Sequence, residues 1–229
     1  MYRYETHLHT FPVSKCAKAG VRETVELYKK LGYDGVFITN HFLDGNINVD
    51  KNIPYEEKIN FYFSDYEQAL EIGKDLGIKV FLGVELSYGG TDFLIYGPDK
   101  EFYLAHPEIM EMKKSAELDF LMEQGALVIQ AHPFREAHYI DHIRLYPRNV
   151  LGVEVLNSSM PDEVNELAEK YREGYGLLQF AGSDNHTGPA RKKLAGMQSA
   201  RPVENPWDFA QMVKTGQMEI FSLENPFAE

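Results

Sequence analysis

The sequence has a single cysteine, no long apolar run and few basic residues. Cys16, the one cysteine, cannot form an intramolecular disulfide, so the fold must rest on packing and on any metal that it binds, which suits a reducing compartment. No apolar run approaches the roughly eighteen residues of a membrane span, and the first residues lack the basic and apolar regions of a signal peptide. We therefore expect a cytoplasmic protein without a membrane partner.

Basic residues are outnumbered by acidic ones, 23 to 35, and the formal net charge is −12. Tight binding to a long nucleic acid needs a basic surface that replaces the phosphate counterions. Long nucleic acid is therefore a poor candidate partner, and a small ligand is easier to accept. A solvated acidic surface explains most of the excess charge, so charge alone does not indicate a metal site.

Short apolar runs alternate with helix-like stretches along the whole chain of 229 residues. This alternation is typical of an α/β protein with β-α units around a parallel sheet. Strand-like runs cover residues 2–5, 35–39, 79–86, 93–97, 126–131, 151–156 and 177–181. Helical periodicity covers residues 22–31, 64–76, 107–124, 162–175 and 206–217, and the polar segment 42–63 is expected to be a long loop. Seven strand-like runs without a linker predict a barrel in a single domain over residues 1–229.

Histidines cluster at the C-terminal ends of the strand-like runs. Five of the eight histidines follow or close such a run, namely His7, His9, His41, His132 and His186. The C-terminal ends of the strands of a parallel barrel meet at one face. Two residues separated by one position in an extended segment point to the same side. The pair His7 and His9 can therefore bind one ion, and so can the pair Asp184 and His186.

Two glutamates lie inside apolar runs, where an unpaired carboxylate carries a large desolvation cost. A bound cation would offset this cost for Glu85, whose two oxygens can bridge two ions. Glu154 is expected to contact a metal ligand and orient it, rather than to bind the metal itself. Mixed imidazole and carboxylate ligands suit zinc, manganese or iron. Each of these residues taken singly is more often structural, but chance does not explain their joint placement.

The order of these motifs resembles the polymerase and histidinol phosphatase (PHP) superfamily across residues 7–186. The matching segments are His7-Leu8-His9-Thr10, Gly35-Val36-Phe37-Ile38-Thr39-Asn40-His41, Gly83-Val84-Glu85, Ala131-His132-Pro133 and Gly182-Ser183-Asp184-Asn185-His186. The resemblance implies a distorted seven-stranded, TIM-like β/α barrel with two or three divalent ions at its C-terminal face, and usually phosphoester hydrolysis. It also implies that the first ion is held by His7, His9, Glu85 and Asp184, and the second by Glu85, His132 and one further ligand.

This chain departs from the family pattern at two positions. The further ligand of the second ion is commonly a histidine, and this chain offers Asp92 or His106 with equal merit. Trinuclear members place an Asp or His shortly after the first motif, where this chain has Ser14-Lys15-Cys16. A protonated lysine cannot bind metal, so His41 and His186 would lack their usual third partner, and two ions are expected rather than three. Lys15 would then substitute for the third cation beside the substrate phosphate; the alternative is that it is a surface lysine. Cys16 is expected to be a small packed residue.

The function expected from these residues is hydrolysis of a small phosphomonoester, similar to histidinol phosphate or a nucleotide, by a metal-held hydroxide. Glu85, Asp184 and His186 are the expected catalytic residues. Arg135, one turn beyond His132, would clamp the phosphate. The alternatives are an amidohydrolase, which also opens with His-x-His, and a metal-binding domain without turnover. The sequence leaves the substrate, the native metal and the oligomeric state open.

Overall fold

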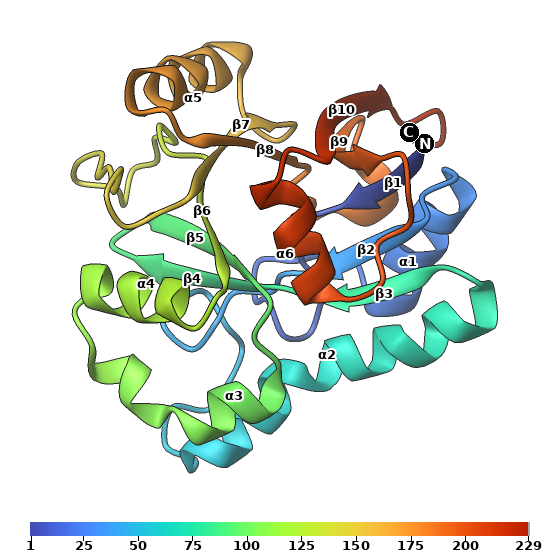
Figure 1. The fold of residues 1–229 in the computed structure, drawn as a ribbon. Helices are drawn as coiled ribbons and strands as arrows, with labels where there is room; N and C mark the ends of the chain where they lie inside the picture. The colour runs from blue at the N-terminus through green and yellow to red at the C-terminus, as the bar shows by residue number, and fades with distance from the viewer. Residues whose placement is uncertain (229) are drawn as a thin grey trace.

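The computed structural model describes residues 1–228 and contains two five-stranded sheets (Figure 1). The first sheet contains, in spatial order, β10 (Met218–Glu224), β9 (Lys193–Ser199), β1 (Tyr2–Glu5), β2 (Gly35–Ile38) and β3 (Lys79–Leu82). The second contains β4 (Val84–Tyr88), β5 (Thr91–Tyr96), β6 (Leu127–Ala131), β7 (Gly152–Asn157) and β8 (Leu178–Gly182). The seven predicted strand-like runs all coincide with strands, whereas β9 and β10 were not predicted.

The predicted seven-stranded barrel is wrong, because the described strands form two mixed sheets that do not close into one barrel. Four neighbouring pairs are antiparallel: β1–β9, β9–β10, β4–β5 and β5–β6. β4 and β5 are joined by Gly89 and Gly90, whose φ angles are 57° and 83°. Positive φ at both central positions is what a two-residue hairpin requires. Parallel strands need a much longer crossover connection, so this glycine pair excludes the all-parallel arrangement.

Six α-helices and two short 3₁₀ helices are present among residues 1–228. The α-helices are α1 (Val21–Lys30), α2 (Tyr55–Leu76), α3 (Lys100–Ala105), α4 (Lys114–Glu123), α5 (Asp162–Tyr175) and α6 (Pro206–Lys214), and the 3₁₀ helices are η1 (Pro107–Glu111) and η2 (Gly188–Ala190). α2 takes up the end of the segment predicted as a loop, because Ile59, Tyr62 and Phe63 bury one face there at helical spacing. No helix in this part of the chain is long and apolar enough to cross a membrane.

The two sheets share a hydrophobic core that α6 covers (Figure 1). Phe209 of α6 packs against Phe37 of the first sheet, with ring centroids 4.4 Å apart, and against Tyr96 of the second, at 5.1 Å. All three side chains are fully buried. Burial of such large apolar surfaces is the main stabilising contribution to a fold, so this cluster fixes the two sheets relative to each other.

The chain passes from one sheet to the other at Gly83, between β3 and β4. The amide of Gly83 donates to the Ile38 carbonyl at 3.0 Å, and a Cβ added here would lie 2.6 Å from the Thr39 side chain. Only glycine fits so close an approach. The next residues continue beside the end of β2, where His41 and Glu85 form an isolated bridge. A second bridge joins Leu8 to Asn185, so the ends of β1, β2, β4 and β8 meet.

Candidate metal centre

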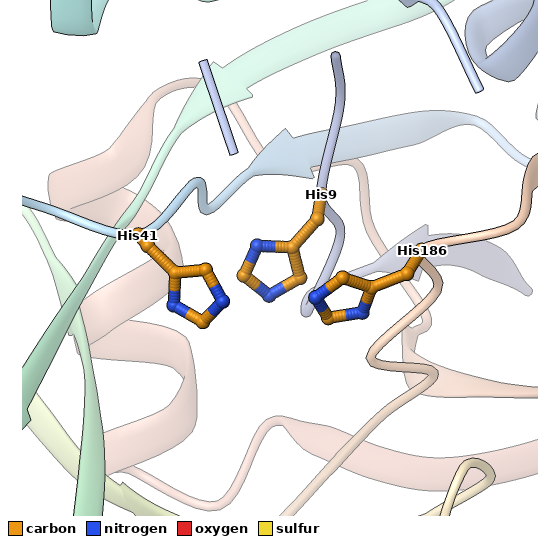
Figure 2. A group of neighbouring side chains, drawn as sticks. All are labelled: His9, His41 and His186. Atoms are coloured by element: carbon orange, nitrogen blue, oxygen red, sulfur yellow. The ribbon is translucent and has the colours of Figure 1, made fainter. Parts of the chain in front are cut away.

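The structure brings together all seven residues that the sequence most strongly predicted as metal ligands. His7 and His9 follow β1, His41 follows β2, Glu85 lies in β4, His132 follows β6, and Asp184 and His186 follow β8. Three groups each have ligand atoms within 4.8 Å of one another: His9, His41 and His186; His7, Glu85 and His132; His7, His9 and Asp184. Figure 2 shows the first group, with rings from three separate segments lying side by side.

Glu85 lies at the centre of this cluster and is fully buried. Its Oε1 lies 3.0 Å from His7 Nε2 and 3.6 Å from His132 Nε2. Its Oε2 lies 3.3 Å from His9 Nε2 and 2.6 Å from His41 Nδ1. Burial acts to raise the pKa of Glu85, but the charges of the surrounding histidines outweigh burial and hold this pKa well below its ordinary value. Two oxygens that face different histidine pairs have the geometry of a bridging ligand.

Asp184 approaches the cluster from the opposite sheet edge. Its Oδ1 lies 3.5 Å from His9 Nε2 and 3.2 Å from His186 Nδ1, and its Oδ2 lies 3.8 Å from His132 Nε2. The φ angles of Asp184 and His132 are 50° and 25°. Residues other than glycine seldom adopt positive φ, and where they do, the strain is often functional.

The side chains fit divalent metal ions. Within residues 1–228, four of their buried atoms have no hydrogen-bond partner, although some lie near a carboxylate at an unfavourable angle: His9 Nε2, His41 Nδ1, Glu85 Oε2 and His132 Nε2. Leaving a buried polar atom unpaired costs about 1–3 kcal/mol. A cation between them would give these atoms a partner, and imidazole nitrogens with carboxylate oxygens are the ligands that zinc, manganese and iron accept.

A set of outer contacts orients the two histidines of the first motif. Glu154 Oε1 lies 2.9 Å from His7 Nδ1, and Glu154 Oε2 accepts the His132 amide at 3.1 Å. The Ser14 hydroxyl lies 3.0 Å from His9 Nδ1 and accepts the His41 amide at 3.1 Å. Both Nδ1 atoms are thereby engaged, which leaves each Nε2 directed at the cluster. Glu154 thus lies where the sequence suggested, whereas Ser14 was not predicted.

Asp65, which sequence reasoning missed, ties the loop after β1 to the end of β2. Its Oδ2 accepts the Thr10 hydroxyl at 2.7 Å, the Val13 amide at 3.2 Å and the Asn40 amide group at 3.2 Å. The signal was present in the sequence, because Asp65 is a carboxylate on the apolar face of α2. A buried carboxylate at such a position requires donors from elsewhere in the fold.

Ionisation in the metal-free chain follows from this crowding. Burial acts to lower the pKa of His7, but the carboxylates of Glu154 and Asp184 outweigh it and raise the pKa well above its ordinary value. Burial, together with the nearby His186, lowers the pKa of His9. Burial acts to raise the pKa of the Cys16 thiol, but hydrogen bonds with His186 and His41 lower it to about 6. His7 therefore carries an added proton that a metal would displace, whereas His9 is neutral.

The two alternatives for the further ligand occupy different environments. Asp92 is buried, its Oδ2 lies 3.8 Å from His132 Nε2, and its Oδ1 accepts the Ser87 hydroxyl at 2.6 Å. His106 follows α3, is partly buried, and places Nδ1 2.8 Å from Glu108 Oε1. Among residues 1–228 neither belongs to the three groups of converging ligand atoms, but Asp92 lies beside His132 of the cluster, whereas His106 pairs with Glu108.

A pocket of about 740 Å³ opens above the cluster. Its lining includes Cys16, His41, Asp92, Asp184 and His186, together with two arginines, Arg135 and Arg191. Arg135 Nη2 donates to the Tyr139 hydroxyl at 2.6 Å, and its Nη1 lies 3.8 Å from Asp92. Lys15 is exposed and does not belong to this lining, whereas its neighbour Cys16 does.

Arg191 was not predicted, because no strand-like run precedes it. Its guanidinium donates to the Ser158 carbonyl, and within residues 1–228 its buried Nε has no hydrogen-bond partner. Burial lowers its pKa, but a guanidinium stays charged in proteins. The pocket wall therefore holds a second cationic group besides Arg135.

No protein-family model and no curated protein sequence matches the chain. Solved structures do, at low sequence identity. A two-domain protein from Bacteroides vulgatus, described as containing a predicted PHP-like metal-dependent phosphoesterase, matches with a TM-score of 0.66 and 14% identity over 96% of this chain, which spans 64% of that protein's chain. A protein from Bifidobacterium adolescentis, for which metal-dependent phosphoesterase activity has been suggested, matches with a TM-score of 0.54 and 15% identity over 82% of this chain and 88% of that one.

An amidohydrolase from Chromobacterium violaceum, with sulfate and no metal bound, matches with a TM-score of 0.54 and 12% identity over 95% of this chain and 97% of that one. At such identities the likeness concerns the fold. The predicted resemblance to the PHP superfamily is confirmed at that level: the chain has a PHP-like fold.

Proposed function

We propose that this protein is a metal-dependent phosphoesterase that hydrolyses small phosphomonoesters. The observation that carries the proposal is the meeting of buried Glu85 with four histidines beneath a pocket that two arginines line. Two of the similar structures are described as metal-dependent phosphoesterases, and the third binds sulfate, a tetrahedral oxyanion like phosphate.

Two ions would share Glu85 as a ligand. His7, His9, Glu85 and Asp184 would hold one ion, and Glu85, His132 and Asp92 a second, with zinc, manganese or iron as candidates. Divalent ions there would supply Lewis acidity and lower the pKa of a water. Glu154 and Ser14 would keep the His7 and His9 rings in place, as their hydrogen bonds of 2.9 and 3.0 Å indicate.

The arginines would bind the substrate. A guanidinium offers several donors in one plane, which matches the oxygens of a phosphoryl group. Arg191 has a buried Nε free of hydrogen bonds within residues 1–228, and Arg135 is held towards the cluster beside Asp92. The pocket volume of about 740 Å³ lies in the range of small-molecule sites. Asp184 and His186 line this pocket, so we place them with Glu85 in the catalytic machinery.

The test is a phosphate-release assay with the metal-free protein after loading with zinc, manganese or iron. We expect release from small monoesters, loss of release on chelation, and no release by Glu85→Gln. Glu166→Gln, an exposed position on α5, is the matched control and should behave as the parent protein. Hydrolysis by Glu85→Gln at the parent rate would contradict the proposal.

The second candidate is an amidohydrolase, which the similarity to the Chromobacterium violaceum protein favours. Cyclic amides in the same assay separate the two, because an amidohydrolase would cleave them and leave the phosphomonoesters intact. Metal binding without hydrolysis of either class would instead indicate a domain without turnover.

A further inference from the structure

We infer that Ser87 is a positioning residue, whose hydroxyl holds the Asp92 carboxylate so that one fixed oxygen faces the second metal ion. The inference rests on the proposed metal-dependent function, in which Asp92 is a ligand of that ion. Ser87 would not bind the ion itself, so its effect would pass through Asp92.

The pairing of β4 with β5 places the two residues directly opposite each other. Ser87 is the partner of Asp92 in this antiparallel register, and residues so placed have Cβ atoms about 4.5–5.5 Å apart. The hairpin turn at Gly89 and Gly90 fixes the register of the two strands. The Ser87 backbone is held separately, because its amide donates to Asp44 Oδ1 at 3.1 Å. The fold therefore holds the serine beside Asp92 independently of the bond between their side chains.

The Ser87 hydroxyl engages one oxygen of the Asp92 carboxylate. Ser87 Oγ donates to Asp92 Oδ1 at 2.6 Å, and no other hydrogen-bond donor among residues 1–228 reaches this carboxylate. A hydroxyl bond this short to a carboxylate is charge-assisted and roughly twice as strong as a neutral one. Asp92 is only 4% exposed. Loss of the hydroxyl would therefore leave a buried oxygen unpaired, which costs about 1–3 kcal/mol and favours another orientation of the carboxylate.

The other oxygen of Asp92 faces the metal centre and the pocket. Asp92 Oδ2 lies 3.8 Å from His132 Nε2 and 3.8 Å from Arg135 Nη1. A carboxylate binds an ion through one oxygen or through both. With Oδ1 engaged by Ser87, the oxygen that Asp92 offers to an ion is Oδ2. A ligand whose orientation is already fixed by such an outer contact binds metal more tightly than a mobile one.

The test counts bound manganese and does not depend on activity. Metal-free protein is titrated with Mn²⁺, and free Mn²⁺ is measured by electron paramagnetic resonance, which gives the number of bound ions and the affinity of each. The parent protein should bind at least two ions. Ser87→Ala should weaken one of them by about 10–100-fold and leave the others unchanged. Ser87→Thr, which keeps the hydroxyl, and Ser115→Ala, at an exposed serine of α4, should behave as the parent.

A double-variant cycle separates positioning from a general effect on the fold. Asp92→Asn should weaken the same ion by removing its ligand. Addition of Ser87→Ala to this variant should cause no further loss, because the serine acts only through the Asp92 carboxylate. A serine that merely stabilised the fold would weaken binding equally in both backgrounds. Circular dichroism of each variant checks that it folds.

Three results would overturn the inference: a single Mn²⁺ per chain in the parent protein, equal affinities in the parent and Ser87→Ala, or additive losses in the double variant. These results are separable from failure of the proposed function. Metal-dependent phosphate release, with manganese binding unchanged in Ser87→Ala, contradicts only the role of Ser87. Loss of one ion's affinity in Ser87→Ala but not in Ser87→Thr, in a protein that releases no phosphate with any metal, supports the positioning role and contradicts the phosphoesterase.

Discussion

Two groups of carboxylates in this protein are neutralised in different ways. Near α4, Lys114 Nζ lies 2.7 Å from Asp44 Oδ2 and 2.7 Å from Glu117 Oε2, and its side chain is only 6% exposed. In the candidate metal centre, Glu85 and Asp184 face histidines instead. The first group carries a permanent cation of its own.

The two groups differ in whether the cation that faces the carboxylates can be replaced by a metal ion. An ammonium has no lone pair and cannot bind metal, whereas an imidazole that loses its proton can. In the metal-free chain the pKa of His7 and that of His41 are raised by nearby carboxylates against the effect of burial. These protons can be exchanged for metal ions. The Lys114 group is therefore structural, and the Glu85 group is suited to exchangeable cations.

Asp184→Asn should have the largest effect. Asparagine tolerates the positive φ at this position, so the backbone should be kept while the negative charge is lost. Metal-ion catalysis contributes several kcal/mol, and hydrolysis should fall on the order of 10³-fold. Initial rates together with metal content provide the measurement. A rate within about tenfold of the parent would show that Asp184 is not a functional ligand.

Lys114→Met should break the other group. The buried carboxylate of Glu117 and the more exposed one of Asp44 would lose their cation. Removing one partner of a buried ion pair costs about 3–5 kcal/mol of folding free energy, while metal content per folded chain should not change. Urea unfolding of the metal-free protein measures the loss. Lys113→Met, at the exposed neighbour, is the control and should shift stability by less than about 0.5 kcal/mol. Similar stability of the two variants would mean that Lys114 does not neutralise its partners.

Glu154→Gln should have a smaller effect on the metal centre. The change keeps the shape of the side chain but removes the charge behind His7, and loss of such an outer partner typically costs about 10–100-fold in metal affinity or activity. Zinc affinity by competition with a chelator is the measurement, with Glu166→Gln as the exposed control. Unchanged affinity would argue that the 2.9 Å contact between Glu154 and His7 does not tune the metal.

Glu117→Gln should have the smallest effect, seen only in the pH dependence of stability. Burial, opposed by Lys114, raises the pKa of Glu117 from 4.5 to about 7. Between these values the folded chain holds a proton that the unfolded chain has lost, so this residue makes stability fall as pH rises. Glutamine still accepts from Lys114 but does not titrate, so most of this fall should disappear. Unfolding curves across this pH range test it, and identical slopes in parent and variant would contradict it.

The sequence predicted the seven principal candidate ligands, which the structure brings together, because their signal is local. His7 and His9 alternate along an extended segment, and Glu85 lies within an apolar run, where an unpaired carboxylate would be costly. The prediction of a barrel was wrong for a reason that is also present in the local sequence. Gly89 and Gly90 form a tight hairpin turn. The prediction relied on the seven strand-like runs and did not take this glycine pair into account.

Other features were decided by contacts between distant segments. Asp65 reaches the loop after β1 from 55 residues away, and Arg191 reaches the pocket after a stretch with no strand-like pattern. Asp92 and His106 had equal merit in the sequence, and only the pairing of β5 with β6, which sets Asp92 opposite Ala131, brought one of them beside His132.

By itself, the sequence determined which residue types close the strands, because spacing and apolar context depend only on neighbours along the chain. The tertiary structure alone decided which of these residues meet, and that Cys16 rather than Lys15 lines the pocket with His41 and His186. The physical reason is that strand pairing and the path of a loop depend on packing between segments far apart in sequence.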